Sequence, residues 1–216
     1  MATALLLSGC SALPDKPVRP TLYDFGPGRI TLEPATRQAP LPALALEDIT
    51  TSGGALDNTA LLYRLAYTEV QALRPYANAR WSTPPAQLVR QRLREQLSLR
   101  RPVFNARDGV AINRSGGAVL PLRLRLELEE FSHLFTAPDA SVGVIRLRAT
   151  LVDVTPAGEK FLGQRSVVVQ RPAPTADAPG GVRALTAATD AAIEEIDSWL
   201  QQNSATLTGG GGQAGS

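Results

Sequence analysis

The chain has 216 residues, of which 44% are hydrophobic and 19% are charged, and its net charge is +2 at pH 7. This length fits one domain with terminal appendages, and the composition is typical of a globular protein. No stretch approaches the roughly 20 apolar residues that a membrane-spanning helix needs. The near balance of charges argues against nucleic-acid binding. One cysteine and one histidine exclude an internal disulfide and disfavour a zinc site.

A short apolar run and two small residues come directly before the cysteine, in the segment Leu5–Cys10. This pattern resembles the lipobox of bacterial lipoproteins, in which the cysteine receives a diacylglycerol. We therefore predict that residues 1–10 are a lipoprotein signal peptide and that Cys10 is lipidated; the alternative is an ordinary terminus with a buried cysteine. Export signals ordinarily carry a basic start and about 7 to 15 apolar residues. Since Met1–Leu7 lacks both, we expect the natural start to lie upstream.

Two flanking segments differ in composition from the rest. Residues 11–21 contain three prolines and few large apolar groups, which predicts an extended, semi-rigid tether. Residues 204–216 include the glycine run Gly209–Gly212 and are expected to be disordered, because they cannot bury enough apolar surface to offset the entropy of ordering. The domain is therefore expected to span residues 22–203.

The first elements of the domain are predicted to be short. Strands are expected at Tyr23–Phe25 and Leu44–Ile49, and Leu61–Leu65 with Val70–Leu73 resembles a hairpin. An amphipathic helix is predicted over residues 84–99, because apolar residues recur there every four positions behind two prolines.

Five arginines cluster in and just after this helix, and we interpret them as its solvated face rather than as a phosphate-binding stripe; they are Arg90, Arg92, Arg94, Arg100 and Arg101.

The second half predicts a meander followed by a helix. Leucines alternate with polar residues over Leu120–Glu130, Ile145–Leu151 repeats the pattern, and a turn leads to a third strand through Phe161–Val169. Period two indicates strands with one buried and one wet face. A helix is predicted over residues 179–202, behind Asp177, with its acidic residues facing water. This order of elements predicts an α+β fold, an antiparallel or mixed sheet with two main amphipathic helices packed on it.

The sequence carries no enzyme signature. His133 is expected in the loop that ends the long strand, and it has no second histidine to assist it. The chain has neither a Gly-x-Ser-x-Gly elbow nor a phosphate loop with its lysine. Asp24, Glu47 and Asp48 are interpreted as solvated rim carboxylates. We therefore expect no catalytic residues, no metal and no cofactor.

One segment is unusually rich in aromatic residues and arginines, a composition typical of protein interfaces. It predicts a partner interface made of Tyr63, Arg64, Tyr76, Arg80 and Trp81. The alternative is that these tyrosines and the tryptophan fill the core beside the helix.

The sequence resembles the auxiliary lipoprotein components of ABC-type transport systems, the PqiC-like lipoproteins. The resemblance is carried by short segments spread over almost the whole chain, namely Cys10 in its lipobox, Tyr23–Gly26, Leu62–Arg64, Tyr76–Trp81, Pro84–Pro85, Leu124–Phe131, Arg146–Leu151 and the end of the last helix at Asp197–Leu200.

This resemblance implies a lipid-anchored accessory on the periplasmic side of the cell envelope. Its implied partners are an MCE-domain protein and an ABC permease and ATPase, which together move phospholipids or other hydrophobic molecules between the inner and outer membranes. Ser11 after the cysteine favours the outer membrane over the inner, and a homo-oligomer is compatible with the role. Two alternatives are a hydrophobic-ligand-binding lipoprotein and an activator of a cell-envelope enzyme.

Overall fold

The protein was analysed as a computed structural model, which describes residues 18–28, 41–106, 120–155 and 157–209, the side chains of residues 204–209 excepted. Cys10, most of the predicted tether and the last residues of the predicted tail lie outside the described residues. The strands are β1 (Thr21–Tyr23), β2 (Leu44–Leu46), β3 (Thr50–Thr51), β4 (Ala60–Leu65), β5 (Glu69–Trp81), β6 (Val103–Asn105), β7 (Leu122–Ala137), β8 (Ala140–Thr155) and β9 (Gly158–Pro172). The helices are the short η1 (Gly54–Leu56), α1 (Pro85–Ser98) and α3 (Ala178–Gly209).

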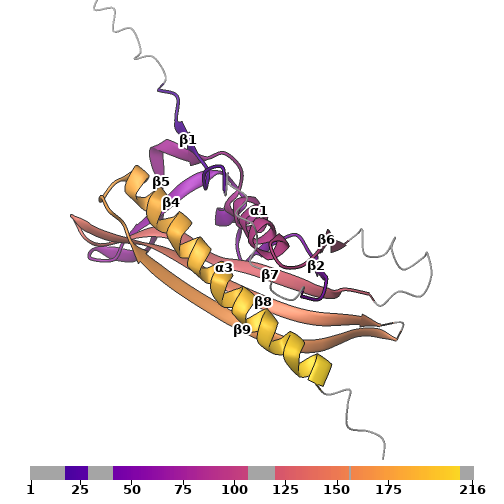
Figure 1. Cartoon of the computed structure of the whole chain (residues 1–216). Helices are drawn as coiled ribbons and strands as arrows, with labels where there is room; N and C mark the ends of the chain where they lie inside the picture. The colour runs from indigo at the N-terminus through magenta and orange to yellow at the C-terminus, as the bar shows by residue number, and fades with distance from the viewer. Residues whose placement is uncertain (1–17, 29–40, 107–119, 156, 210–216) are drawn as a thin grey trace, which may run out of the picture.

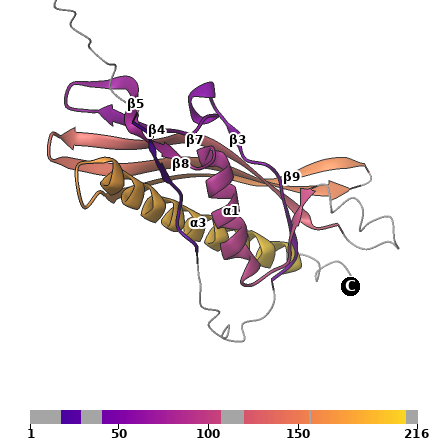
Figure 2. The same cartoon turned by 90° about the horizontal axis from the view of Figure 1, so that it is seen from above.

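The described strands form one mixed sheet, and α1 and α3 cover the same face of it (Figures 1 and 2). The other face carries no helix in the described part of the chain, and we call it the outer face. The expected α+β fold with two main helices is therefore confirmed.

Strand β7 is the centre of the sheet. Along one edge it pairs antiparallel with β8 over almost its whole length. Along the other edge three short segments follow one another, all parallel to it: β2 beside Leu122–Leu124, β3 beside Glu127–Leu128 and β4 beside His133–Phe135. The chain between residues 44 and 65 is thus laid along β7.

The predicted meander is confirmed as β7, β8 and β9, but its first strand does not end at Glu130. It continues to Ala137. The alternation of buried and exposed residues is interrupted where the pairing with β8 shifts between Leu128 and Glu130. Such a bulge adds one residue and changes which side chains face inward. His133 therefore lies within a central strand with none of its surface exposed, and the expectation of a loop histidine was wrong.

The predicted hairpin is confirmed as β4 and β5, and β5 runs on to Trp81, well beyond the expected end at Leu73. The last three residues of β5 pair in parallel with β1, which lies two residues before the predicted Tyr23–Phe25. Because the pairing is parallel, the chain before Thr21 runs toward the start of β5. Residues 18–20 thus lie on the side from which β5 enters this pairing.

Helix α1 begins close to the predicted position, with Pro85 in its first turn, where a missing N–H costs nothing. Its apolar stripe, Val89, Leu93 and Leu97, is buried against the sheet. Burying each such side chain contributes roughly 1.5–3 kcal/mol.

Helix α3 begins behind Asp177, as expected, since the Gly180 backbone N–H donates to the Asp177 carboxylate over 2.7 Å. It ends at Gly209 rather than at residue 202. The helix lies very close to β8, because a Cβ on Gly143 would stand 2.5 Å from the backbone of Ala184. A glycine is required at that crossing.

The arginines around α1 are not a solvated face, contrary to expectation. The guanidinium of Arg101 is buried and donates to Asp197 of α3 over 2.7 Å. Arg92 forms two hydrogen bonds to Asp190 of the same helix, of 2.7 and 3.0 Å. These arginines join the two helices, and Asp197 does not simply face water.

Candidate functional site

The five residues of the predicted interface lie on the β4–β5 hairpin. Tyr63 and Tyr76 meet with ring centroids 4.7 Å apart on the inner side of the sheet. Arg64 follows Tyr63 and points to the opposite face, since successive strand residues alternate. It binds Glu130 of β7 through two hydrogen bonds of 3.1 and 3.3 Å. The cluster is therefore divided between two faces.

Trp81 is a core residue, with 1% of its surface exposed. Its ring lies edge-on to Phe25, at a centroid distance of 5.7 Å, and 5.5 Å from Phe131. Arg80 is half-buried and donates to the backbone oxygens of Ala79 and Tyr76. In the isolated chain, Trp81 thus follows the core-filling alternative.

Tyr76 reaches a group that the sequence did not connect with it. Its hydroxyl lies 2.8 Å from Nδ1 of His133. Both rings lie under the start of α3, where a Cβ on Gly181 would stand 2.4 Å from the same Nδ1. No sequence signal pairs residues 57 positions apart, and the bulge in β7 hides the inward direction of His133.

Burial determines the charge state of this pair. It lowers the pKa of His133 from 6.5 to about 4, against a smaller opposing effect of Asp177. Burial also raises the pKa of the Tyr76 hydroxyl. Both groups are therefore neutral at pH 7, and Nε2 of His133 is buried without a partner. With no exposed surface, His133 has no access to a substrate in this conformation and acts as a packed core residue.

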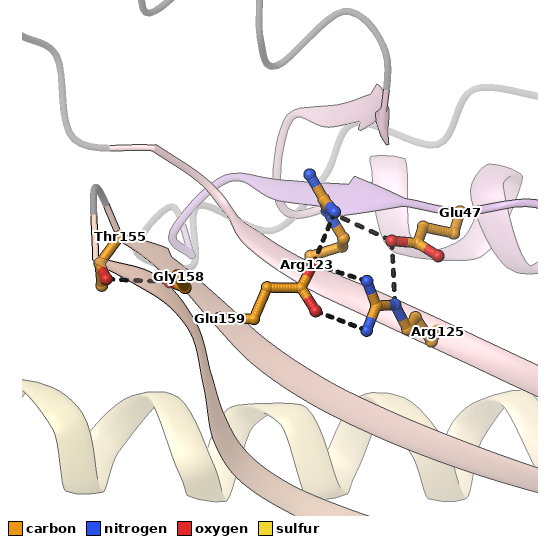
Figure 3. Close-up of polar contacts among 6 residues, drawn as sticks. All are labelled: Glu47, Arg123, Arg125, Thr155, Gly158 and Glu159. Carbon is orange, nitrogen blue, oxygen red and sulfur yellow. Dashed lines mark hydrogen bonds and ion pairs between the residues drawn. The ribbon is translucent and has the colours of Figure 1, made fainter.

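A second cluster gathers charges on the outer face, close to the β8–β9 turn (Figure 3). Arg125 donates to both carboxylate oxygens of Glu159 over 2.7 and 2.8 Å, and to Glu47 over 3.0 Å. Arg123 bridges the same two carboxylates. We call Glu47, Arg123, Arg125 and Glu159 the outer cluster.

The arginines of the outer cluster stabilise the ionised carboxylate beside them. The hydrogen bond from Arg125 and its charge lower the pKa of Glu159. In turn, the bonds to Glu159 and Glu47 raise the pKa of Arg125. Glu159 and Arg125 are therefore both charged at neutral pH. Because Glu159 is exposed, these bonds exchange readily with water or with a partner.

An exposed aromatic side chain stands beside the outer cluster. Phe161 has 64% of its surface exposed. It is in register with Val152 of β8, which is in register with Arg123 of β7. Phenylalanine beside arginines is a composition enriched at protein interfaces. The sequence predicts Phe161 in a strand and carries no signal of its exposure.

Two of the hollows between the described elements are open grooves. The first, of about 910 Å³, lies between α1 and β3 and has Arg90, Arg94, Asp48 and Asp57 in its lining. The second, of about 400 Å³, lies between the two helices and is lined in part by Arg92, Glu95 and Asp190. A charged, open lining does not suit an acyl chain, which binds in apolar surroundings.

Two further features are absent from the described part of the chain. It contains no group of three or more histidine, cysteine or acidic residues placed to hold a metal ion. None of its helices has the length and apolarity to cross a membrane.

Comparison with solved structures shows the fold. Protein XCC0632 from Xanthomonas campestris superposes with a TM-score of 0.67 at 16% identity, over 87% of this chain and 99% of the other. An uncharacterized protein gives 0.56 at 13% identity, over 84% and 99%. The hypothetical protein CT253 from Chlamydia trachomatis gives 0.50 at 7% identity, over 76% and 98%. No match is found among curated proteins.

The model of one protein family matches residues 23–197. This range includes all of α1, most of α3 and every described strand, apart from the start of β1. Its members are auxiliary lipoprotein components of ABC-type transport, which is not a known enzyme class. The chain therefore belongs to the family of ABC-type transport auxiliary lipoprotein components.

Proposed function

We propose that this chain is a periplasm-facing lipoprotein accessory of an MCE/ABC-type system that moves phospholipids or other hydrophobic molecules between the inner and outer membranes. A lipid on Cys10 would anchor it, with the outer membrane favoured. The observation that carries the proposal is the family match over residues 23–197. The open, charged grooves support a role through surface contacts rather than as a carrier.

The geometry favours a partner contact at the end remote from the anchor. The first described residues lie in the same half of the molecule as the β4–β5 hairpin, whereas the β8–β9 turn lies at the opposite end (Figures 1 and 2). An adaptor held to one membrane meets a complex from the other membrane with its distal end. That end carries the outer cluster and Phe161.

The outer cluster suits this contact physically. Its exposed Arg125–Glu159 pair presents charges of both signs, whose bonds can exchange with groups of a partner, and Phe161 supplies exposed apolar area next to it. Burying an aromatic anchor beside arginines is the usual arrangement of an energetic hot spot. The predicted interface on the hairpin remains the competing location, with Arg80 as its most direct probe.

The test is co-purification of the anchored chain with an MCE-domain protein encoded beside it, followed by measurement of Kd for the pair. We expect Phe161→Ala to weaken binding at least about tenfold, the effect of a hot-spot residue. Val168→Ala is the matched control, since Val168 is also an exposed apolar residue of β9, and it should leave Kd nearly unchanged. Loss of binding by Arg80→Ala alone would move the contact to the hairpin. Clean capture without any MCE protein would reject the function itself.

A further inference from the structure

The turn between β4 and β5 exposes two apolar side chains that do not belong to the buried core. Tyr67 and Val70 have 45% and 42% of their surface exposed. They lie at the tip of a well-ordered turn, in which the Thr68 backbone N–H donates to the carbonyl of Leu65 and the Ala66 N–H donates to that of Phe135. A tip held in this way presents its side chains in a fixed direction. We call Tyr67 and Val70 the hairpin tip.

The tip lies in the same half of the molecule as the first described residues (Figures 1 and 2). Strand β1 is parallel to the end of β5, so residues 18–20, which precede it, point back along the end of β5. Val18, the first described residue, is itself exposed. It lies eight positions after Cys10 in the sequence, and at about 3.3–3.6 Å per position the chain between them spans at most roughly 29 Å.

From these observations we infer that the hairpin tip contacts the lipid bilayer to which the chain is anchored, so that the domain is held at the membrane at two points. The inference rests on the proposed lipid anchor at Cys10. A short tether keeps the N-terminal side of the domain near the headgroups at high effective concentration. There, a weak apolar contact is sufficient to set its orientation.

The chemistry of the tip fits the interface between water and lipid. Tyrosine has an apolar ring and a polar hydroxyl, and it is enriched at membrane–water interfaces. The charges at the tip compensate each other, since Arg74 lies 3.6 Å from Glu69. The contact is therefore apolar rather than electrostatic, and it requires no excess of anionic lipid.

The opposite end of the domain provides the matched control. Leu65 is in register with Phe135, near one end of β7, whereas Phe161 is in register, through β8, with Arg123 near the other end. Twelve residues of β7 separate these rows, a distance of about 40 Å at roughly 3.3 Å per residue. If the tip touches lipid, Phe161 is held in water.

The experiment uses the full chain behind an export-competent signal peptide, lipidated in cells and reconstituted in vesicles of phosphatidylethanolamine and phosphatidylglycerol. Lipidation consumes the thiol of Cys10, the chain's single cysteine, so Val70→Cys or Phe161→Cys carries the sole free thiol for an environment-sensitive fluorophore. On vesicles, relative to detergent-free lipid-free protein made with Cys10→Ser, we expect a severalfold intensity gain and a blue shift at position 70. Neither is expected at position 161.

Further measurements make the outcomes decisive. The gain at position 70 should persist at high salt and should fall when Tyr67→Ser is added, with far-ultraviolet circular dichroism checking that the variants are folded. If the protein floats with the vesicles but position 70 reports water, the tip contact is overturned and the anchor stands. If the lipidated preparation does not float, the anchor has failed and the inference falls with it, whereas partner binding is measured separately.

Discussion

Arg101 and Arg125 both bind carboxylates through hydrogen bonds of 2.7 Å, but they lie on opposite sides of the sheet. Arg101 is buried beneath the two helices with 1% of its side chain exposed, whereas Arg125 lies in the outer cluster, open to water. Burial lowers the pKa of Arg101, while hydrogen bonding raises that of Arg125. An arginine–carboxylate pair therefore joins two helices where it is buried, whereas at the surface its hydrogen bonds exchange readily with water or with a partner.

The largest loss of stability is expected when the acidic partner of the buried arginine is removed. Asp197→Ala leaves the charge of Arg101 buried without compensation, which should lower the free energy of unfolding by about 3–5 kcal/mol. Urea denaturation monitored by circular dichroism measures this loss. A loss below about 1 kcal/mol, the range of surface pairs, would mean that Arg101 finds water or another acceptor and that the two pairs are alike.

A second prediction concerns how stability depends on pH, to which His133 on the inner face contributes. The folded pKa of His133, about 4, lies below its ordinary value of 6.5, so the unfolded chain takes up a proton first as the pH falls. Its contribution to stability is complete above pH 6.5 and is lost between that pH and about 4. The slope is at most about 1.4 kcal/mol per pH unit, or roughly 2 kcal/mol between pH 6.5 and 5.

Denaturation midpoints of the wild type and of His133→Gln across that pH range measure this contribution. The variant should be less stable at neutral pH but should show a flatter dependence on pH. Equal slopes would show that His133 is protonated in the folded protein as easily as in the unfolded one.

The smallest effect on stability is expected in the outer cluster. Glu159→Gln removes a charge from an exposed network and should leave the free energy of unfolding nearly unchanged, because exposed pairs contribute little to stability. High salt should reduce even this difference, because exposed pairs are screened. A loss as large as that of Asp197→Ala would remove the contrast between the two faces and assign the outer cluster a structural role.

The sequence predicts well those elements whose pattern repeats without interruption. The alternating leucines of β7 and the four-residue spacing in α1 each place one face against the core. The pattern fails at Glu129 and Glu130, where the bulge puts the next buried residue, Phe131, three positions after Leu128. A period of two therefore ends there although the strand continues.

The site was less predictable than the fold, because its contacts join residues far apart in the chain. Arg101 looks like a surface residue until α3 brings Asp197 to it, 96 positions later. The aromatic segment indicated an interface by composition, but composition does not distinguish Trp81, which is packed on Phe131, from Phe161, which is exposed. The strand register, which composition does not reveal, places Trp81 in the core and Phe161 at the surface.

The three short strands that lie along β7 also constrain the order in which this chain folds. Strands β2, β3 and β4 pair with β7 residues that follow them by 70 to 78 positions, whereas β7, β8 and β9 pair with one another as successive strands of the chain. Contacts between distant residues form late, because the loop that they close costs more entropy. A chain that emerges N-terminus first therefore cannot complete the pairing of β2, β3 and β4 until β7 has followed them. The sheet closes on this side only after the meander has formed.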